Sequence, residues 1–255
     1  MLSKYESVCY ELLRPEQIKA LREQCPIIYI PTGTLEWHSW QNPLGTDALK
    51  AHAICCEAAL RYGGAVLPPF YQGLVGTHNW GPDGWRGYTQ AYNEEAMFAS
   101  AMQGIVKAMV YGKWKVIVGV TGHDFPPQQE AMQKAIELET EGTDVTGFAE
   151  MEGGLHVMDD EIPYTMDHAA AWETSCMMYA YPERVDMDAL RQHMVSTGDM
   201  LELFVSDGKT GPEGIGGPNP MKYASRELGQ KIIEKMSDLI GSKARAFLSH
   251  KGINA

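Results

Sequence analysis

The stretch PIIYIPTGTLEWHSWQNPLGTD, residues 26–47, combines a strand pattern with a cluster of polar side chains near the start of this 255-residue chain. Residues 26–31 are apolar and bounded by prolines, as is typical of a buried central strand. Glu36 and His38 lie two positions apart beyond it, so they would point the same way on an extended backbone. Asp47 would then return from the loop to face them. Such residues are common on any surface, but in this arrangement they are candidate metal ligands.

A second element of the same kind lies far along the chain. Residues 115–120 (KVIVGV) have the pattern of another buried strand and lead directly into Thr121-Gly122-His123-Asp124. The carboxyl end of a parallel strand is where α/β proteins place functional groups, which makes His123 a further candidate ligand. The alternative is a strand-end histidine whose ring is satisfied by a backbone carbonyl.

The alternation of elements predicts the fold class. With 44% hydrophobic residues the chain can bury a substantial core, and we expect one domain over residues 1–255. Strands are expected at residues 26–31, 65–67, 115–120 and 145–151, and helices at residues 47–61, 93–111, 128–138, 168–181 and 220–249. This order predicts an α/β domain with a mostly parallel sheet flanked by helices on both faces.

Charge and hydropathy exclude several classes of partner. The formal net charge of -12 argues against binding to nucleic acid or to an anionic membrane, because both require a basic surface. Apolar runs stop well short of the roughly 20 residues that a spanning helix needs. The first 25 residues are charged throughout and lack the apolar core of a signal peptide, so we expect a cytoplasmic protein.

Cysteines and glycines give weaker signals. The five cysteines are odd in number and show no C-x-x-C spacing, which suggests neither a disulfide framework nor a thiolate zinc site. We expect most of them to be small buried residues, with a catalytic cysteine as the weaker alternative. The glycine-rich residues 208–218 lie between expected helices, and they are interpreted as a flexible surface loop or as an active-site flap or subunit contact. Neither a dinucleotide-binding nor a P-loop motif occurs.

Four elements in order resemble the creatininase (creatinine amidohydrolase) family. The segment at residues 36–47 is similar to the family signature E-x-H-G-x-H-L-P-x-G-T-D, and Gly122-His123 resembles the N-G-H-x-x-N element. His168-Ala169-Ala170-Ala171-Trp172-Glu173-Thr174-Ser175 resembles the H-A-G-x-x-E-T-S element. The glycine-proline sequence at residues 216–218 and the helix after it are similar to the family's C-terminal elements.

The resemblance implies a hydrolase with a two-metal site, usually zinc or manganese, often within a homohexamer. Iron would also suit a mixed nitrogen and oxygen shell. Carried over by residue, Asp47 would bridge the two ions, Glu36 and His123 would complete one site, and His38 would hold the other. Two such ions can lower the pKa of a shared water and polarise a carbonyl.

Departures from the family pattern concern the second metal and the first loop. Creatininase takes a glutamate two residues after the strand-end histidine, and Phe125, which cannot bind a metal, stands at that position here. Glu173 is therefore the candidate substitute ligand, and the alternative is an ordinary helix-face carboxylate. Ser39 also replaces the glycine that usually follows the first histidine. If Glu173 does not serve, the second site would be weak or empty.

Several further residues are candidates for the substrate pocket. Trp40, Phe125 and Trp172 lie beside proposed ligands in the sequence and could form its flat walls or belong to the core. His78 matches another family histidine and either lines the pocket or lies on a surface loop. His168 matches a substrate-side histidine, so the resemblance assigns it to proton transfer or oxyanion stabilisation.

The reaction expected from this resemblance is hydrolysis of a small cyclic substrate. A metal-bridging hydroxide would attack the carbonyl of a cyclic amide and open its C–N bond. One alternative is C–C hydrolysis of a cyclic ketone derived from an inositol, a reaction of some relatives. Another is a catalytically idle family member that binds metal, in which Phe125 marks loss of the second ion.

Overall fold

The core of the protein is a parallel sheet of four strands. The computed structural model describes residues 2–74, 94–155, 167–250 and 252. The strands are β1 (Ile27–Thr32), β2 (Ala65–Val66), β3 (Val116–Thr121) and β4 (Thr146–Met151), in the order β2-β1-β3-β4. Thr32 pairs with Thr121, and Thr121 pairs with Met151, so three strands end level with one another. Loops that follow these ends therefore meet at one edge of the sheet.

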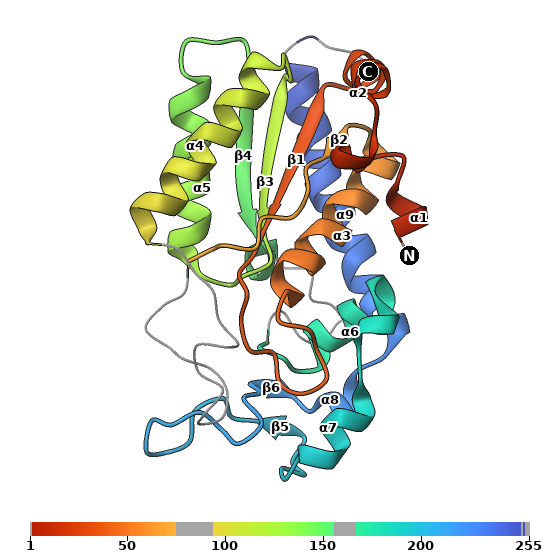
Figure 1. The fold of residues 1–255 in the computed structure, drawn as a ribbon, viewed down its shortest axis with the longest axis vertical. Coiled ribbons are helices and arrows are strands. Elements are labelled where there is room, and N and C mark those ends of the chain that lie inside the picture. The colour runs from red at the N-terminus through yellow and green to blue at the C-terminus, as the bar shows by residue number, and fades with distance from the viewer. Residues whose placement is uncertain (1, 75–93, 156–166, 251, 253–255) are drawn as a thin grey trace.

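Helices cover both faces of the sheet (Figure 1). Ile28 and Ile30 of β1 pack with α4 (Glu95–Tyr111) and α5 (Pro126–Thr140) on one face. Ile27 and Tyr29 pack on the other face, with α3 (Thr46–Tyr62) and α9 (Arg226–His250). Because successive side chains of a strand alternate between faces, burial on both sides explains the continuous apolar run. The expected α/β class, with helices on both faces of the sheet, is confirmed.

Shorter elements complete the described part of the chain. An antiparallel pair, β5 (Met200–Leu201) and β6 (Gly217–Pro218), lies apart from the main sheet, and α6 (Ala171–Ala180) packs on α9 and α3. The remaining elements are α1 (Leu2–Tyr5), η1 (Tyr10–Leu12), α2 (Pro15–Gln24), η2 (Glu152–Leu155), η3 (Pro182–Arg184), α7 (Met187–His193) and α8 (Pro220–Tyr223). The glycine-rich residues 208–218 end in β6.

Two expected helices differ from those observed. The helix expected from residue 168 begins only at Ala171, because the Asp167 carboxylate accepts the backbone N–H groups of Trp172 and Glu173. His168 instead exchanges backbone hydrogen bonds with Gly216. The single helix expected over residues 220–249 is divided into α8 and α9, since the backbone at Ala224 is extended.

Close contact between α3 and the strand ends depends on glycine. A Cβ atom at Gly122 would lie 2.2 Å from the backbone oxygen of Asp47. Only a residue without a side chain allows the end of β3 to approach the first turn of α3 this closely. The Thr121-Gly122-His123 sequence therefore brings His123 toward Asp47.

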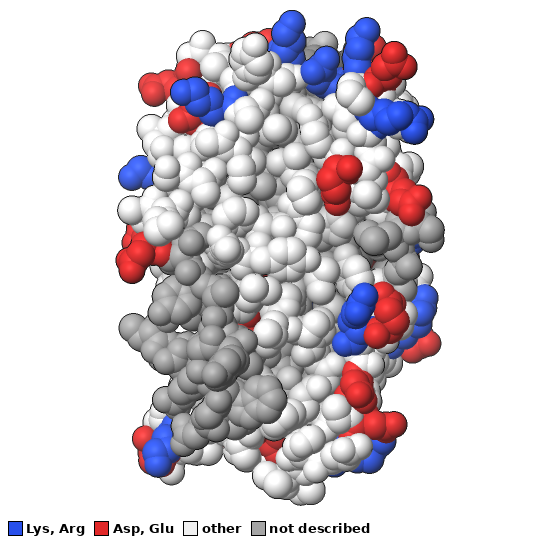
Figure 2. All heavy atoms as spheres, viewed as in Figure 1, with Lys and Arg blue, Asp and Glu red and all other residues white. Residues whose placement is uncertain are grey.

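The charged surface and the cysteines agree with the sequence. On the face drawn in Figure 2, basic and acidic side chains are interspersed near the rim, without a broad basic area among the described residues.

All five cysteines are buried free thiols, as expected for small interior residues. Among the described residues, no helix combines the length and apolar character needed to cross a bilayer.

Candidate metal centre

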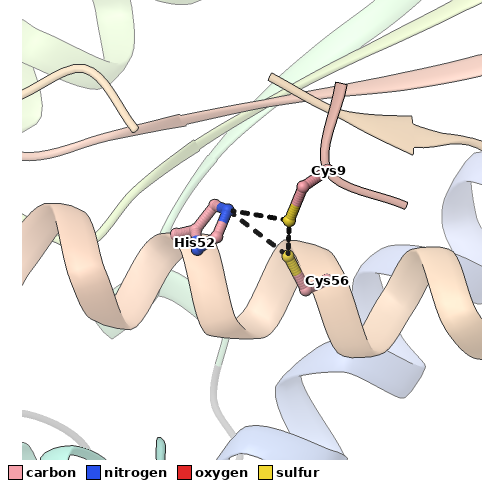
Figure 3. A group of neighbouring side chains, drawn as sticks. All are labelled: Cys9, His52 and Cys56. Carbon is pink, nitrogen blue, oxygen red and sulfur yellow. Dashed lines mark hydrogen bonds between the residues drawn. The ribbon is translucent and has the colours of Figure 1, made fainter. Parts of the chain in front are cut away.

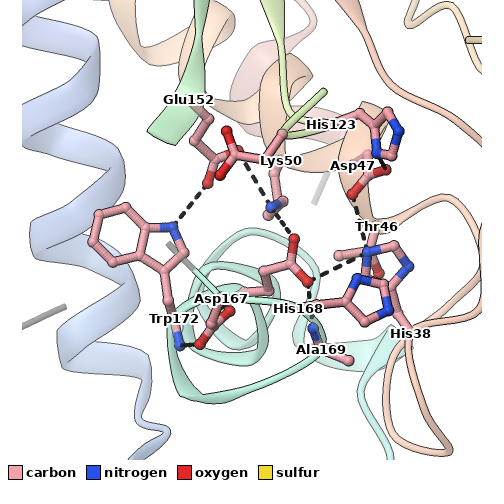
Figure 4. Close-up of polar contacts among 12 residues, drawn as sticks. His38, Thr46, Asp47, Lys50, His123, Glu152, Asp167, His168, Ala169 and Trp172 are labelled. Atoms are coloured by element: carbon pink, nitrogen blue, oxygen red, sulfur yellow. Dashed lines mark hydrogen bonds and ion pairs between the residues drawn. The ribbon is translucent and has the colours of Figure 1, made fainter. Parts of the chain in front are cut away.

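Candidate ligands converge where β1 and β3 end. Glu36 and His38 lie in the loop after β1, Asp47 occupies the second position of α3, and His123 follows β3. Glu173 projects from the first turn of α6. All of these residues except His38 border a cavity of about 400 Å³. Figure 4 shows the side chains of His38, Asp47 and His123 close together, although they come from separate segments.

One group of candidate ligands consists of Glu36, Asp47 and His123. Nδ1 of His123 lies 3.1 Å from Oδ2 of Asp47 and 3.2 Å from Oε2 of Glu36. Donor atoms about 2.1 Å from a shared ion lie roughly 3.0–3.4 Å from one another, depending on coordination geometry. The observed spacing therefore suits a bound divalent ion.

A second group shares Asp47 with the first and adds His38 and Glu173. Nε2 of His38 lies 3.0 Å from Oδ1 of Asp47 and 3.3 Å from Oε2 of Glu173. The other ring nitrogen, Nδ1, lies 3.1 Å from the backbone oxygen of Glu36. Because a carbonyl can only accept, Nδ1 carries a proton, which leaves Nε2 as the atom that a metal ion would bind when the ring is neutral. Asp47 thus faces one group with each of its oxygens.

Several buried side-chain atoms of the candidate ligands lack hydrogen-bond partners, as expected of atoms that bind a cation. Oε1 of Glu36, Nε2 of His38 and Oδ2 of Asp47 are buried without a well-oriented hydrogen bond to any described residue. Leaving such atoms unpaired costs about 1–3 kcal/mol each, and more for charged groups. A divalent ion at each group would satisfy them, so the donor set fits metal.

Charge balance points the same way. The described residues that line this cavity and the small hollow beside it include six carboxylates: Glu36, Asp47, Asp124, Glu152, Asp167 and Glu173. Lys50 is the one permanent cation among those lining residues. Burial of so many acids requires further positive charge or protonation. Consistent with this, burial raises the pKa of Glu152 to about 7 and, with the nearby Glu173, that of Asp167 to about 8.

Lys50 and Glu152 were not found by sequence reasoning. The Nζ atom of Lys50 lies 2.5 Å from Oε1 of Glu173 and 3.3 Å from Oε2 of Glu152. The indole N–H of Trp172 donates to the other oxygen of Glu152 at 2.9 Å. Lys50 lies one helical turn after Asp47, which is the only sequence signal that it faces the same way. Its contacts hold Glu173 in place from the side away from His38.

His168 lies against the second group. Its Nε2 atom is 2.9 Å from the backbone oxygen of Trp37, and its ring centroid is 4.7 Å from that of His38. Burial and the nearby His38 lower the pKa of His168, so the ring is neutral at pH 7. Since Nε2 must donate to the carbonyl, Nδ1 of the neutral ring carries no proton. This tautomer suits a proton acceptor better than an oxyanion donor.

The three aromatic residues predicted to line the pocket lie in different surroundings. Trp172 is buried in the core between the sheet and α9, and Phe125 packs at the edge of the core under α4 and α5. Trp40 is partly buried, and its ring stacks on His193 with centroids 4.0 Å apart. None of these three is among the described residues that border the 400 Å³ cavity of the candidate metal centre, whereas Leu203 and Gly216 are. His78 lies outside the described residues.

Gly216 gives the glycine-rich segment a position at the site. It pairs with His168 through two backbone hydrogen bonds of 2.8 and 2.9 Å. The end of residues 208–218 therefore borders the cavity, and a role of this segment as an active-site flap stays a prediction.

Comparisons with known proteins place the chain in a family. Residues 11–242 match the Creatininase family, described as creatinine amidohydrolase. Because the match spans most of the chain, the protein belongs to the creatininase family of hydrolases. Creatinine amidohydrolase of Pseudomonas putida is 25% identical over 222 residues, which cover 82% of this chain and 84% of that protein.

Two solved creatininases have the same fold. A structure named Creatininase Mn has a TM-score of 0.75 at 20% identity and covers 94% of this chain and 98% of its own. A mutant creatininase of the Zn-Zn type has a TM-score of 0.73 at 20% identity, covering 93% of this chain and 97% of its own.

Proposed function

We propose that this protein hydrolyses the C–N bond of a small cyclic amide with the help of two divalent metal ions. The observation that carries the proposal is the pair of ligand groups that share Asp47. The relative named creatinine amidohydrolase supports the reaction class, and creatininases named for Mn and for Zn-Zn support these metals. A cavity of about 400 Å³ has room for a small ring compound.

Each ligand has a role that follows from its position. Glu36 and His123 would hold one ion, His38 and Glu173 the other, and Asp47 would contact both. When bound, the two ions would supply an activated hydroxide and polarise the substrate carbonyl. The protein would hold this geometry, because the carboxylates and His38 are buried.

His168 is the residue that we propose for proton transfer. Its Nδ1 atom would take the proton of the attacking water and later deliver it to the departing nitrogen. The hydrogen bond from Nε2 to the Trp37 carbonyl keeps the ring in the tautomer that this requires. Burial and the neighbouring His38 lower the pKa of His168, so the ring can accept a proton from water but readily gives it up again.

Metal content per chain, measured with a hydrolysis screen, tests the proposal. Elemental analysis of wild type loaded with Mn²⁺, an ion that prefers nitrogen and oxygen ligands to thiolates, should give about two ions per chain. Glu173→Ala should reduce this to about one and abolish hydrolysis of cyclic amides. Glu57→Gln is a control variant. Glu57 is a buried glutamate on α3, away from the candidate metal centre, and its carboxylate contacts Lys4 and Tyr5.

Other outcomes would favour the alternatives. Activity only on cyclic polyol ketones would indicate C–C hydrolysis. One ion or none in wild type, without activity, would indicate an idle family member. Homohexamer formation and a cytoplasmic location stay predictions, and light scattering on the purified protein tests the first.

A further inference from the structure

Three side chains with metal-binding atoms converge on the flank of α3 away from its first turn. Cys9 belongs to the segment between α1 and η1, whereas His52 and Cys56 lie four residues apart on α3. Figure 3 shows the two thiols and the imidazole facing one another. All three side chains are buried. The spacing of four residues places His52 and Cys56 on one face of the helix.

The distances match the edges of a tetrahedral zinc site. The two Sγ atoms lie 3.9 Å apart, and Nε2 of His52 lies 3.7 Å from Cys9 and 3.5 Å from Cys56. Bonds of about 2.3 Å to sulfur and 2.1 Å to nitrogen place two sulfurs about 3.8 Å apart and sulfur about 3.6 Å from nitrogen. An ion at the centre would therefore need little movement of its ligands.

The surroundings of His52 support a ligand role. Its other nitrogen, Nδ1, lies 3.0 Å from the hydroxyl oxygen of Tyr181, which fixes the orientation of the ring. Tyr5 packs edge-on against the imidazole with centroids 6.5 Å apart. A cavity of about 850 Å³ is lined by His52 and Tyr181, so an ion in solution has a route to the imidazole.

We propose that Cys9, His52 and Cys56 form a second metal site, for zinc or a similar divalent ion that favours sulfur. It is distinct from the candidate metal centre, whose ligands supply only nitrogen and oxygen. Three protein ligands leave a fourth position for water or a small external ligand. Because Cys9 precedes the sheet and the other ligands lie on α3, the ion would tie the N-terminal segment to the helix that carries Asp47.

Cobalt substitution tests this site independently of hydrolysis. Co²⁺ bound by thiolates gives an intense sulfur-to-metal charge-transfer absorption in the near ultraviolet, which nitrogen and oxygen ligands do not give. Reduced wild-type protein loaded with Co²⁺ should show this absorption with the intensity of about one thiolate-bound ion per chain, because Co²⁺ at the nitrogen and oxygen ligands of the candidate metal centre does not contribute to it. Cys9→Ser and Cys56→Ser should each reduce it by at least half. Cys55→Ser should leave it unchanged, since Cys55 is an equally buried neighbour on the same helix outside the cluster.

Absence of the absorption in folded wild-type protein would overturn the proposal, whatever the variants do. So would its persistence in both Cys9→Ser and Cys56→Ser. If these variants do not fold, His52→Asn keeps both thiols and should weaken Co²⁺ binding at least tenfold, and unchanged binding would contradict the site. Glu173→Ala should keep the absorption, so failure of this proposal and failure of the proposed hydrolysis are separate results.

Discussion

Nζ of Lys50 lies 2.5 Å from Oε1 of Glu173, and both side chains are buried beside the candidate metal centre. Burial alone would raise the pKa of Glu173, but Lys50 and His38 outweigh it and hold that pKa well below its usual value. Lys50 thus keeps Glu173 ionised and engages one of its oxygens. The other oxygen, Oε2, accepts the backbone N–H of Ala169 and faces His38.

Replacement of Lys50 by methionine should make the protein depend on metal for stability. Lys50→Met leaves Glu173 buried without its partner, which should lower the free energy of unfolding of metal-free protein by about 3–5 kcal/mol. A bound ion would neutralise the carboxylate, so Mn²⁺ should raise the melting temperature more in Lys50→Met than in wild type. Calorimetry with and without metal measures both effects.

Lys107→Met is the control for this experiment, because Lys107 is exposed on α4. It should change the free energy of unfolding by no more than about 0.5 kcal/mol. Equal metal-induced shifts in wild type and Lys50→Met would show that Glu173 does not meet a bound ion.

Replacement of His168 should impair the reaction without removing metal. Glutamine keeps a donor for the Trp37 carbonyl but cannot accept and release a proton as imidazole does. His168→Gln should lower kcat by roughly 10²–10⁴-fold, while elemental analysis still finds the wild-type metal content. His193→Gln, which alters an exposed histidine stacked on Trp40, should leave kcat nearly unchanged. Loss of metal together with activity would instead identify His168 as a structural or ligand residue.

Much of the fold followed from the sequence because its strands are buried on both faces. Burial on both sides of β1 and β3 requires continuous apolar runs, and such runs are visible without a structure. Positions of Glu36, His38, Asp47 and His123 after strand ends or at a helix start followed from the same elements. Their convergence depends on parallel strands that end level, which the pattern of strands and helices predicts.

Residues that support the site were hidden because their partners are distant in the chain. Lys50 has the sequence context of a solvated helix residue, and only the folded chain brings Glu173 of α6 and Glu152 of η2 next to it. Likewise Cys9 and Cys56 are 47 positions apart, so no spacing rule detects them. Sequence proximity to a ligand left open whether Trp172 and Phe125 line a pocket or the core, and their assignment to the substrate pocket stays a prediction although both pack with core residues.

Ser39 offers a test of backbone strain next to His38. Its φ angle is 60°, a left-handed conformation that costs a non-glycine residue about 1–2 kcal/mol, and its buried hydroxyl has no hydrogen-bond partner among the described residues. Ser39→Ala should relieve only the unpaired hydroxyl. Ser39→Gly should remove both the unpaired hydroxyl and the backbone strain. The greater conformational freedom of glycine in the unfolded chain should reduce the resulting gain in stability by about 0.5–1 kcal/mol.

We therefore expect stability to increase in the order serine, alanine, glycine at position 39, with total gain on the order of 1 kcal/mol. Urea denaturation of the three proteins measures it. If wild type were the most stable, the hydroxyl of Ser39 would have to make an interaction in solution that compensates for the strained backbone.

Metal loading should release protons from the two histidines of the candidate metal centre. Burial would lower the pKa of His123, but the carboxylates of Asp47 and Glu36 outweigh it and raise that pKa to about 10. In the same way Glu173 and Asp47 raise the pKa of His38 above 6.5. Metal-free protein at pH 7 therefore holds both rings protonated, whereas a metal ligand must be the neutral imidazole.

Histidine protonation and metal binding change the stability of the protein with pH in opposite directions. A raised histidine pKa stabilises the metal-free protein fully below the unfolded value of about 6.5, and this contribution is lost as pH rises toward 10. Metal affinity increases over the same interval, because fewer protons compete. The increase in melting temperature produced by Mn²⁺ should thus grow from pH 6.5 to pH 9, and a weakly buffered indicator assay at pH 7 should detect about two protons released per chain. A metal-induced shift independent of pH, with no proton release, would show that these histidines do not bind the ions.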